Sequence, residues 1–141
     1  MDEIEITDQH DESFVSFLQD RIIEFNIAAT GFDDGRSLTG VIKDEAGEII
    51  AGLDGFTWGG YAKVEWLWVA PDYRGQGLGH RLLAAAEREA AARECLVVRV
   101  DTHTFQAPAF YARLGYEVVG QVAGTPLGHG QVFLSKALGA S

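Results

Sequence analysis

Apolar and polar positions follow two different periods near the start of the chain, and each period predicts a different element. Residues 3–6 (EIEI) alternate with a period of two, which is typical of a strand. Residues 11–25 instead place apolar side chains at helical spacing, at Phe14, Phe17, Leu18, Ile22 and Phe25. We therefore expect a strand followed by a helix.

Three strand-like runs come next, separated by short turn segments. They cover residues 37–42, 48–58 and 61–70. The segments KDEAG and GG between them are hairpin signals. This arrangement predicts an antiparallel meander.

The second half of the chain mixes helical and strand patterns. Residues 80–94 are dense in alanine and leucine and predict a helix, and residues 95–100 (CLVVRV) predict a short buried strand. This strand, helix, strand order predicts that residues 95–100 lie parallel to the strand that ends at residue 70. A short helix at residues 107–114 ends at Gly115, and two strands close the chain. An antiparallel half joined to one parallel crossover is an α+β architecture.

Composition narrows the class of protein. A chain of 141 residues that is 47% hydrophobic predicts one domain with a real core. The net charge of −10 opposes binding to nucleic acid or an anionic membrane and favours a cationic partner, although many proteins are simply acidic. No apolar run has the length of a membrane span, and we expect a cytoplasmic protein. The single cysteine, Cys95, excludes an internal disulfide, and no spacing predicts a metal site.

A cluster of three glycines, RGQGLG at residues 74–79, lies between a predicted strand and a predicted helix. This is the generic arrangement of an anion site, because free backbone N–H groups and the positive end of the helix dipole face the same point. A P-loop is excluded, since no Gly-Lys-Ser/Thr follows. The dinucleotide fingerprint fits poorly, since its third glycine comes one position early. A purely structural turn remains an alternative.

The stretch WVAPDYRGQGLG resembles the R/Q-x-x-G-x-G/A motif of the GNAT acyl-CoA-dependent N-acetyltransferases, and FYARLGYE at residues 110–117 resembles their second motif. The order of elements is similar across nearly the whole chain. The resemblance implies one domain over residues 1–141 with the GNAT fold. That fold is α+β, with a mostly antiparallel mixed sheet of about six to seven strands and about four helices on both faces.

The resemblance also implies acetyl-CoA as the co-substrate, without a metal. The loop amides would cradle its pyrophosphate, and main-chain groups of the preceding strand would bind the pantetheine arm. The positions implied as cofactor contacts are Leu67, Val69, Arg74, Gly75, Gln76, Gly77, Leu78, Gly79, His80 and Thr104. Family members often carry asparagine where this chain has Thr104, so that contact departs from the family pattern.

Acetyl transfer to an amine requires a neutral amine, a polarised thioester carbonyl and a proton for the departing thiolate. Glu65 lies inside an apolar strand, at the position where many family members carry a general base, and the resemblance implies this role. The alternative is a glutamate that pairs with Lys63 or faces solvent at a splayed strand. Tyr111 is at the family's usual general-acid position, with aromatic packing as its alternative. A backbone N–H near Leu67 or Trp68 would polarise the carbonyl.

The acceptor is expected near the loop after the first helix. Phe25, Phe32, Asp33 and Asp34 offer aromatic surface beside two carboxylates there, which suits an amine on an apolar or cationic body. Asp33 and Asp34 beside Gly35 are also ordinary turn formers. His103 and Gln106 follow the end of a predicted strand and could line the cleft, although a histidine in this place is more often a surface or core residue. His129 has no role that the sequence assigns.

We therefore expect an N-acetyltransferase that moves an acetyl group from acetyl-CoA to a primary amine by direct attack in a ternary complex. Three alternatives stay open: a longer acyl donor, an inactive acyl-CoA-binding sensor and a nicotinamide dinucleotide domain. The acceptor is expected to be a small molecule rather than a protein, with neither nucleic acid nor a membrane as partner. The identity of the acceptor and the formation of a homodimer are not fixed by the sequence.

Overall fold

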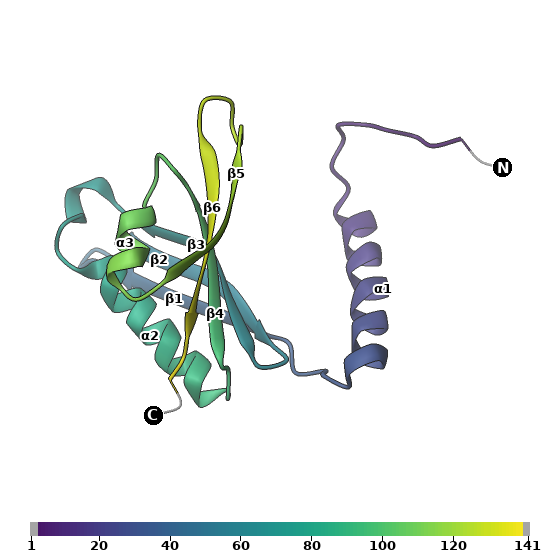
Figure 1. Ribbon diagram of the computed structural model, residues 1–141, viewed down its shortest axis with the longest axis horizontal. Helices are drawn as coiled ribbons and strands as arrows, with labels where there is room; N and C mark the ends of the chain where they lie inside the picture. Colours follow the sequence, from purple (N-terminus) through teal and green to yellow (C-terminus); the bar gives the residue numbers. More distant parts are fainter. Residues whose placement is uncertain (1–2, 140–141) are drawn as a thin grey trace. The chain divides into compact units, whose positions relative to one another are not determined.

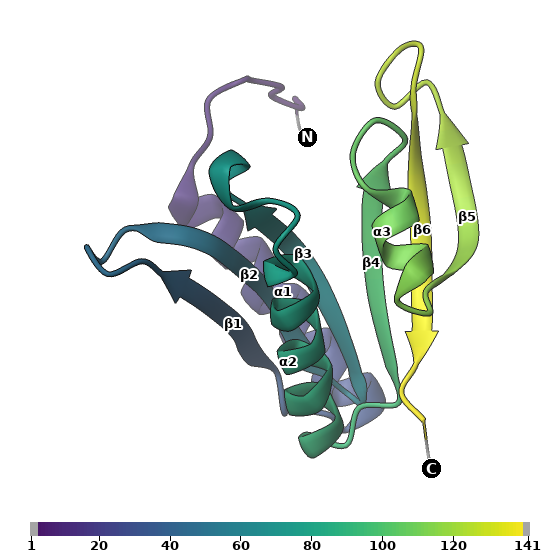
Figure 2. The same cartoon turned by 90° about the vertical axis from the view of Figure 1, so that its left-hand side faces the viewer.

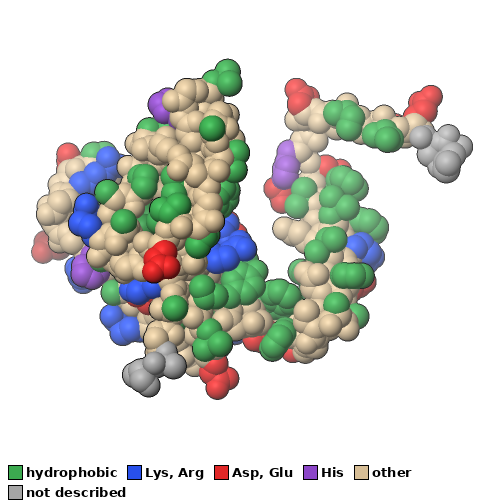
Figure 3. All heavy atoms as spheres, viewed as in Figure 1, with side chains coloured by type: hydrophobic (Ala, Val, Ile, Leu, Met, Phe, Trp, Pro, Cys, Tyr) green, Lys and Arg blue, Asp and Glu red, His purple; other side chains and the backbone are tan. Residues whose placement is uncertain are grey.

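The computed structural model describes residues 3–139, and the chain divides into two compact units at Asp33 and Asp34. The first unit contains helix α1 (Glu12–Thr30). The Asp11 side chain caps this helix by accepting hydrogen bonds from the N–H groups of Ser13 and Phe14. None of the described side chains of α1 is buried, and hydrophobic side chains run along its surface (Figure 3).

The strand predicted at residues 3–6 is wrong, because the structure has no strand there. An alternating run of four residues offers only Ile4 and Ile6 for burial, and these remain 86% and 90% exposed. Without burial or a partner strand, nothing offsets the conformational entropy lost on fixing the backbone.

The second unit is built on a six-stranded sheet, which agrees with the predicted α+β class. Its strands lie in the order β1-β2-β3-β4-β6-β5, and only the β3–β4 pair is parallel (Figure 1). The strands are β1 (Arg36–Lys43), β2 (Ile49–Trp58), β3 (Tyr61–Val69), β4 (Val97–His103), β5 (Glu117–Ala123) and β6 (Gly130–Ala137).

The helices of this unit connect β3 to β4 and β4 to β5. A short 3-10 helix, η1 (Pro71–Tyr73), precedes α2 (Leu78–Ala92), and α3 (Pro108–Arg113) follows β4. Three α-helices in residues 3–139 are fewer than the four expected. Within residues 34–139, α2 and α3 lie on the same face of the sheet, so this unit does not show helices on both faces (Figure 2). No helix between residues 3 and 139 is both long and apolar enough to cross a bilayer.

The core lies between the sheet and these helices. Its most buried large side chains are Leu83 of α2, Val98 of β4 and Leu134 of β6. The C-terminal end of α2 is fixed to the sheet by Arg93, whose guanidinium donates hydrogen bonds to the Ser37 carbonyl and the Thr57 hydroxyl. These contacts join the end of α2 to β1 and β2.

Strands β3 and β4 diverge after a short parallel contact. Only residues 61–64 pair with residues 97–100, although β3 continues to Val69 and β4 to His103 (Figure 2). A β-bulge coincides with the point of divergence, because Gly55 pairs with Val64 and Asp54 pairs with Trp66, which leaves Glu65 as the extra residue.

Gly55 permits the close approach of β2 to β3 at this bulge. A Cβ atom there would overlap the Lys63 carbonyl oxygen and lie 3.0 Å from the Lys63 carbonyl carbon and 3.1 Å from the Val64 Cα. The obstacle is backbone, which cannot rotate away as a side chain can. The bulge, and with it the direction of Glu65, therefore depends on glycine at this position.

Candidate active site

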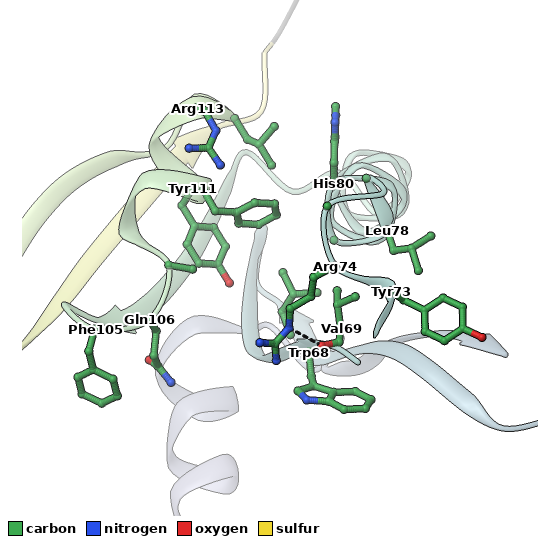
Figure 4. Close-up of a pocket in the computed structure, with 17 residues that line it drawn as sticks. Trp68, Val69, Tyr73, Arg74, Leu78, His80, Phe105, Gln106, Tyr111 and Arg113 are labelled. Atoms are coloured by element: carbon green, nitrogen blue, oxygen red, sulfur yellow. Dashed lines mark hydrogen bonds between the residues drawn. The ribbon is translucent and has the colours of Figure 1, made fainter. Parts of the chain in front are cut away.

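A cavity of about 790 Å³ lies beyond the point where β3 and β4 part (Figure 4). Three elements enclose it: residues 67–69 at the end of β3, residues 73–80 except Gln76, and seven residues within the segment 105–114. The first two segments come from one side of the divergence and the third comes from the other. The cavity is therefore a direct result of the divergence.

The side chains of the lining that can carry a charge near neutral pH are all basic. Arg74, His80 and Arg113 contribute to the lining, and no aspartate or glutamate of the described residues does. This is notable in a chain with 21 acidic and 11 basic residues. Basic side chains thus gather at the cavity although the chain as a whole is negatively charged. This local positive charge favours an anionic ligand in the cavity.

The glycine loop, residues 74–79, adds backbone donors to this positive field. Gly75 and Gly77 have φ angles of 78° and 81°, in the left-handed region that side chains other than glycine rarely adopt. Gly77 caps α2 without any side-chain hydrogen bond, so the first N–H groups of the helix are left for a ligand. Glycine is needed at position 79 for a different reason, because a Cβ atom there would lie 3.3 Å from the Phe110 ring.

Arg74 folds back over the end of β3. Its Nε donates a hydrogen bond of 2.9 Å to the Val69 carbonyl oxygen (Figure 4). Arg74 therefore occupies one of the two lone pairs of a main-chain group predicted to bind the pantetheine arm.

Tyr111 of α3 directs its hydroxyl into the cavity (Figure 4). Its side chain is only 7% exposed, and its ring packs edge-on against Phe110 and Tyr116. No residue between 3 and 139 forms a hydrogen bond with the hydroxyl. Burial, with a smaller effect of the Asp101 charge, raises the pKa of Tyr111 to about 12. At neutral pH this group is a protonated donor.

Glu65 does not line the cavity, and its side chain pairs with a lysine. The Lys63 Nζ lies 3.1 Å from a Glu65 oxygen and 3.2 Å from a carboxylate oxygen of Asp101 on β4. Burial alone would lower the pKa of Lys63, but its hydrogen bonds and charge interactions with the two carboxylates outweigh that effect and raise it. The pairing predicted as the alternative for Glu65 is thus present, while its role as a base stays a prediction.

The family model described as the acetyltransferase (GNAT) domain matches residues 35–118, more than half of the chain. The chain belongs to the GNAT acetyltransferase family. The resemblance predicted from the loop and the second motif is thereby confirmed. The match lies within the second unit and contains both the glycine loop and Tyr111.

Individual relatives of this GNAT protein agree with the family. The acetyltransferase Atu2258 of Agrobacterium fabrum is 33% identical over 126 residues, covering 89% of this chain and 90% of the relative. The blasticidin-S acetyltransferase of Streptomyces morookaense is 42% identical over 97 residues, covering 67% and 70%. The crystal structure of an acetyltransferase from Bacillus cereus is similar with a TM-score of 0.80 and 27% identity, covering 94% of this chain and 97% of the other. This GNAT protein is therefore an acetyltransferase.

The structure brings most of the predicted cofactor contacts of the GNAT protein together in one lining. These are Leu67, Val69, Arg74, Gly75, Gly77, Leu78, Gly79 and His80. Gln76 and Thr104 are not in the lining. The Thr104 hydroxyl instead accepts a hydrogen bond of 3.1 Å from the Gly130 N–H and so ties the end of β4 to β6. A direct cofactor contact of Thr104 has no support from this placement.

The predicted acceptor residues of the GNAT protein are divided between the two units, and their role at the acceptor stays a prediction. Phe25, Phe32 and Asp33 belong to the first unit. Asp34 accepts a hydrogen bond of 2.9 Å from the Gly59 N–H and so holds the β2–β3 turn, at the end of β3 opposite the glycine loop. No turn is assigned at residues 31–35, so the local turn given as the alternative is not seen, and the role of Asp34 at the acceptor stays a prediction.

The sequence did not single out several lining residues of the GNAT protein. They include Tyr73, Phe105, Phe110 and Arg113, whereas Gln106 was noted only as a possible cleft residue. Arg113 had a usable signal, because a residue three positions after Phe110 on a helix shares its face. Between residues 3 and 139, no three His, Cys, Asp or Glu side chains are arranged to hold a metal ion.

Proposed function

We propose that this GNAT protein transfers the acetyl group of acetyl-CoA to the primary amine of a small molecule by direct attack in a ternary complex. The observation that carries the proposal is the basic cavity at the start of α2, into which the buried Tyr111 hydroxyl points. An anion-binding loop and a proton donor on opposite sides of one cavity suit a substrate with a phosphate at one end and a thioester at the other.

The pyrophosphate of acetyl-CoA fits the loop side of this cavity. The free N–H groups at the start of α2 would donate hydrogen bonds to it, and Arg74, His80 and Arg113 would offset its charge. The pantetheine arm would follow the edge of β3 beyond Val64, which β4 no longer pairs. An extended amide-bearing arm can use the hydrogen-bonding groups that an unpaired strand edge presents.

The chemistry then needs two proton transfers. Glu65 would accept a proton from the acceptor ammonium, directly or through water, and the neutral amine would attack the thioester carbonyl carbon. As the C–N bond forms, the C–S bond breaks and the thiolate leaves with the Tyr111 proton. The pKa of about 12 keeps Tyr111 protonated at neutral pH, so its proton is available to the thiolate as the C–S bond breaks. The excess proton on the new amide nitrogen goes to solvent.

A small cationic acceptor is supported by two observations. The relative from Streptomyces morookaense is named for blasticidin-S. The net charge of −10 favours the approach of a cationic amine over that of an anionic substrate. We propose the cytoplasm as the location, where acetyl-CoA is available.

The experiment measures thiol release from acetyl-CoA by the purified protein, with blasticidin S, lysine, spermidine and ethanolamine as acceptors. We expect turnover of at least one amine, and Tyr111→Phe should lower kcat by ~100-fold or more because general acid catalysis is worth at least that much. Stabilisation by CoA and not by NAD is expected in thermal unfolding, where ligand at 100 times its Kd adds about 2.7 kcal/mol. Tight CoA binding without turnover of any amine would refute the enzyme and favour a sensor.

A further inference from the structure

A line of hydrogen-bonded side chains crosses three strands at the point where β3 and β4 part. Gln131 of β6 donates from Nε2 to the Oδ1 atom of Asp101 over 3.1 Å. Lys63 of β3 lies 3.2 Å from the other oxygen of Asp101, Oδ2, and 3.1 Å from Oε2 of Glu65. The line therefore runs from β6 through β4 and ends at the bulge residue of β3.

The two carboxylates of this line differ in what they still offer to a substrate. Both oxygens of Asp101 are already engaged, one by Gln131 and one by Lys63. Glu65 uses only Oε2, and no donor among residues 3–139 reaches its Oε1. Its side chain is also the most exposed of the three charged groups, at 39% against 28% for Asp101 and 16% for Lys63. Glu65, at the end of the line, thus keeps its Oε1 available to accept a hydrogen bond.

We infer that Lys63 and Asp101 are positioning residues, which hold Glu65 in one orientation with its Oε1 directed to the acceptor amine. The inference rests on the role proposed above for Glu65. Neither residue is part of the motifs that identify the family, and neither lines the cavity.

Charge and location support a positioning role over a purely stabilising one. The group carries two negative charges and one positive charge, so it has a net charge of −1 that attracts a cationic amine. An ion pair of this exposure contributes little to stability, typically up to about 1 kcal/mol. Its value for the reaction is geometric, because a fixed carboxylate loses no freedom when the amine arrives. The Asp101 charge also acts on Tyr111, so the line lies close to both groups of the proposed chemistry.

The bulge explains why Glu65 needs this support. A bulge residue lacks a direct partner on the neighbouring strand, so the ladder restricts it less than the paired residues on each side. The side chain of such a residue keeps a fixed direction only when other side chains hold it. Lys63 does so from two positions away on the same strand, and Asp101 fixes Lys63 in turn.

The test compares two kinds of acceptor in the full-length protein. One is the best amine of the panel above, which is protonated at neutral pH. The other is hydroxylamine, which is mostly uncharged and needs no proton removed before attack. Lys63→Met and Asp101→Asn should lower kcat for the protonated amine by ~10- to 100-fold, the loss typical of a misplaced catalytic group, with the KM for acetyl-CoA unchanged. Turnover of hydroxylamine should fall far less.

Control variants separate this effect from a general loss of charge. Arg99→Met removes a cation from β4 whose guanidinium lies over the Tyr61 ring, and Asp54→Asn removes a carboxylate that accepts from Thr39. Both should keep the wild-type kcat for the protonated amine. Lys63→Arg, which keeps the cation, should restore most of the turnover lost in Lys63→Met.

The outcomes separate a failure of the positioning inference from a failure of the proposed function on which it rests. If Glu65→Gln keeps full activity, the proposed role of Glu65 is refuted. If Glu65→Gln is inactive while Lys63→Met and Asp101→Asn keep wild-type kcat, the positioning inference alone is refuted. An equal loss with both acceptors would also refute it, since damage to the fold does not depend on the protonation of the amine.

Discussion

Gly55 offers the sharpest test of how the fold supports the site. Replacing it with alanine adds one methyl group that overlaps the Lys63 carbonyl oxygen and lies 3.0 Å and 3.1 Å from two further backbone atoms. Ordinary contacts of a Cβ atom begin near 3.4 Å, so β2 and β3 must move apart at the bulge. Overpacking costs about 1–3 kcal/mol, and the upper end applies here because the obstacle is backbone.

The assay measures both stability and turnover. A loss of about 3 kcal/mol in the free energy of unfolding corresponds to a fall of about 9 °C in Tm for a chain of this size. Because the shift displaces Glu65, kcat should also fall, by ~100-fold for a displacement near 1 Å. The cavity proposed for acetyl-CoA lies beyond the bulge, so the Kd for CoA should change much less than kcat.

Gly52 provides the matched control on the same strand. A Cβ atom there meets only the Gly40 carbonyl oxygen at 3.5 Å, an ordinary contact. Gly52→Ala should therefore stay within about 0.5 kcal/mol of the wild type. The reasoning is refuted if Gly55→Ala is as stable as Gly52→Ala, or if it is destabilised with an unchanged kcat.

Four further predictions concern the loop, two tyrosines and the basic lining. Gly77→Ala forces a left-handed φ on alanine, which should lower stability by about 1 kcal/mol and reduce the Tm gain given by CoA in a thermal scan. Folding raises the pKa of Tyr111 from about 10 to about 12, so its contribution to stability is complete below pH 10 and is lost as pH rises toward 12. In urea unfolding, Tyr111→Phe should therefore lack this part of the fall in the free energy of unfolding between pH 10 and pH 12. Tyr116→Phe removes a 2.8 Å hydrogen bond to the Glu87 carboxylate and should lower the free energy of unfolding by about 1.5 kcal/mol in the same urea assay. Arg113→Met should weaken CoA binding, measured by calorimetry, without lowering Tm.

Features that depend on neighbours in the chain were predictable from the sequence. The glycine loop and α2 follow from local rules, because left-handed turns require glycine and an alanine-rich segment favours a helix. The basic character of the lining was less visible, since Arg113 approaches the loop only after α3 packs beside it.

Features that depend on two distant strands were not predictable in this way. Glu65 appeared as a charge in an apolar strand, and its bulge, its lysine and Asp101 become related only when β2, β3 and β4 assemble. The contact of the Asp34 carboxylate with the Gly59 N–H likewise joins positions 25 residues apart, while its predicted role at the acceptor stays a prediction. The alternation at residues 3–6 led to a wrong strand prediction. Periodicity shows which face of a strand would be buried, but not whether a neighbouring strand is present to pair with it.

The short parallel contact between β3 and β4 also divides the sheet mechanically. Four residue pairs are the only strand pairing between the three-stranded half β1–β2–β3 and the half β4–β6–β5. Opening this seam breaks few hydrogen bonds but exposes the buried side chains of Ala62, Val64, Val98 and Val100, so exchange of its amide protons reports how firmly the two halves hold together. A co-substrate that binds the β3 edge and α3 at once would bridge the halves, and slower exchange throughout the seam would then report an occupied cavity.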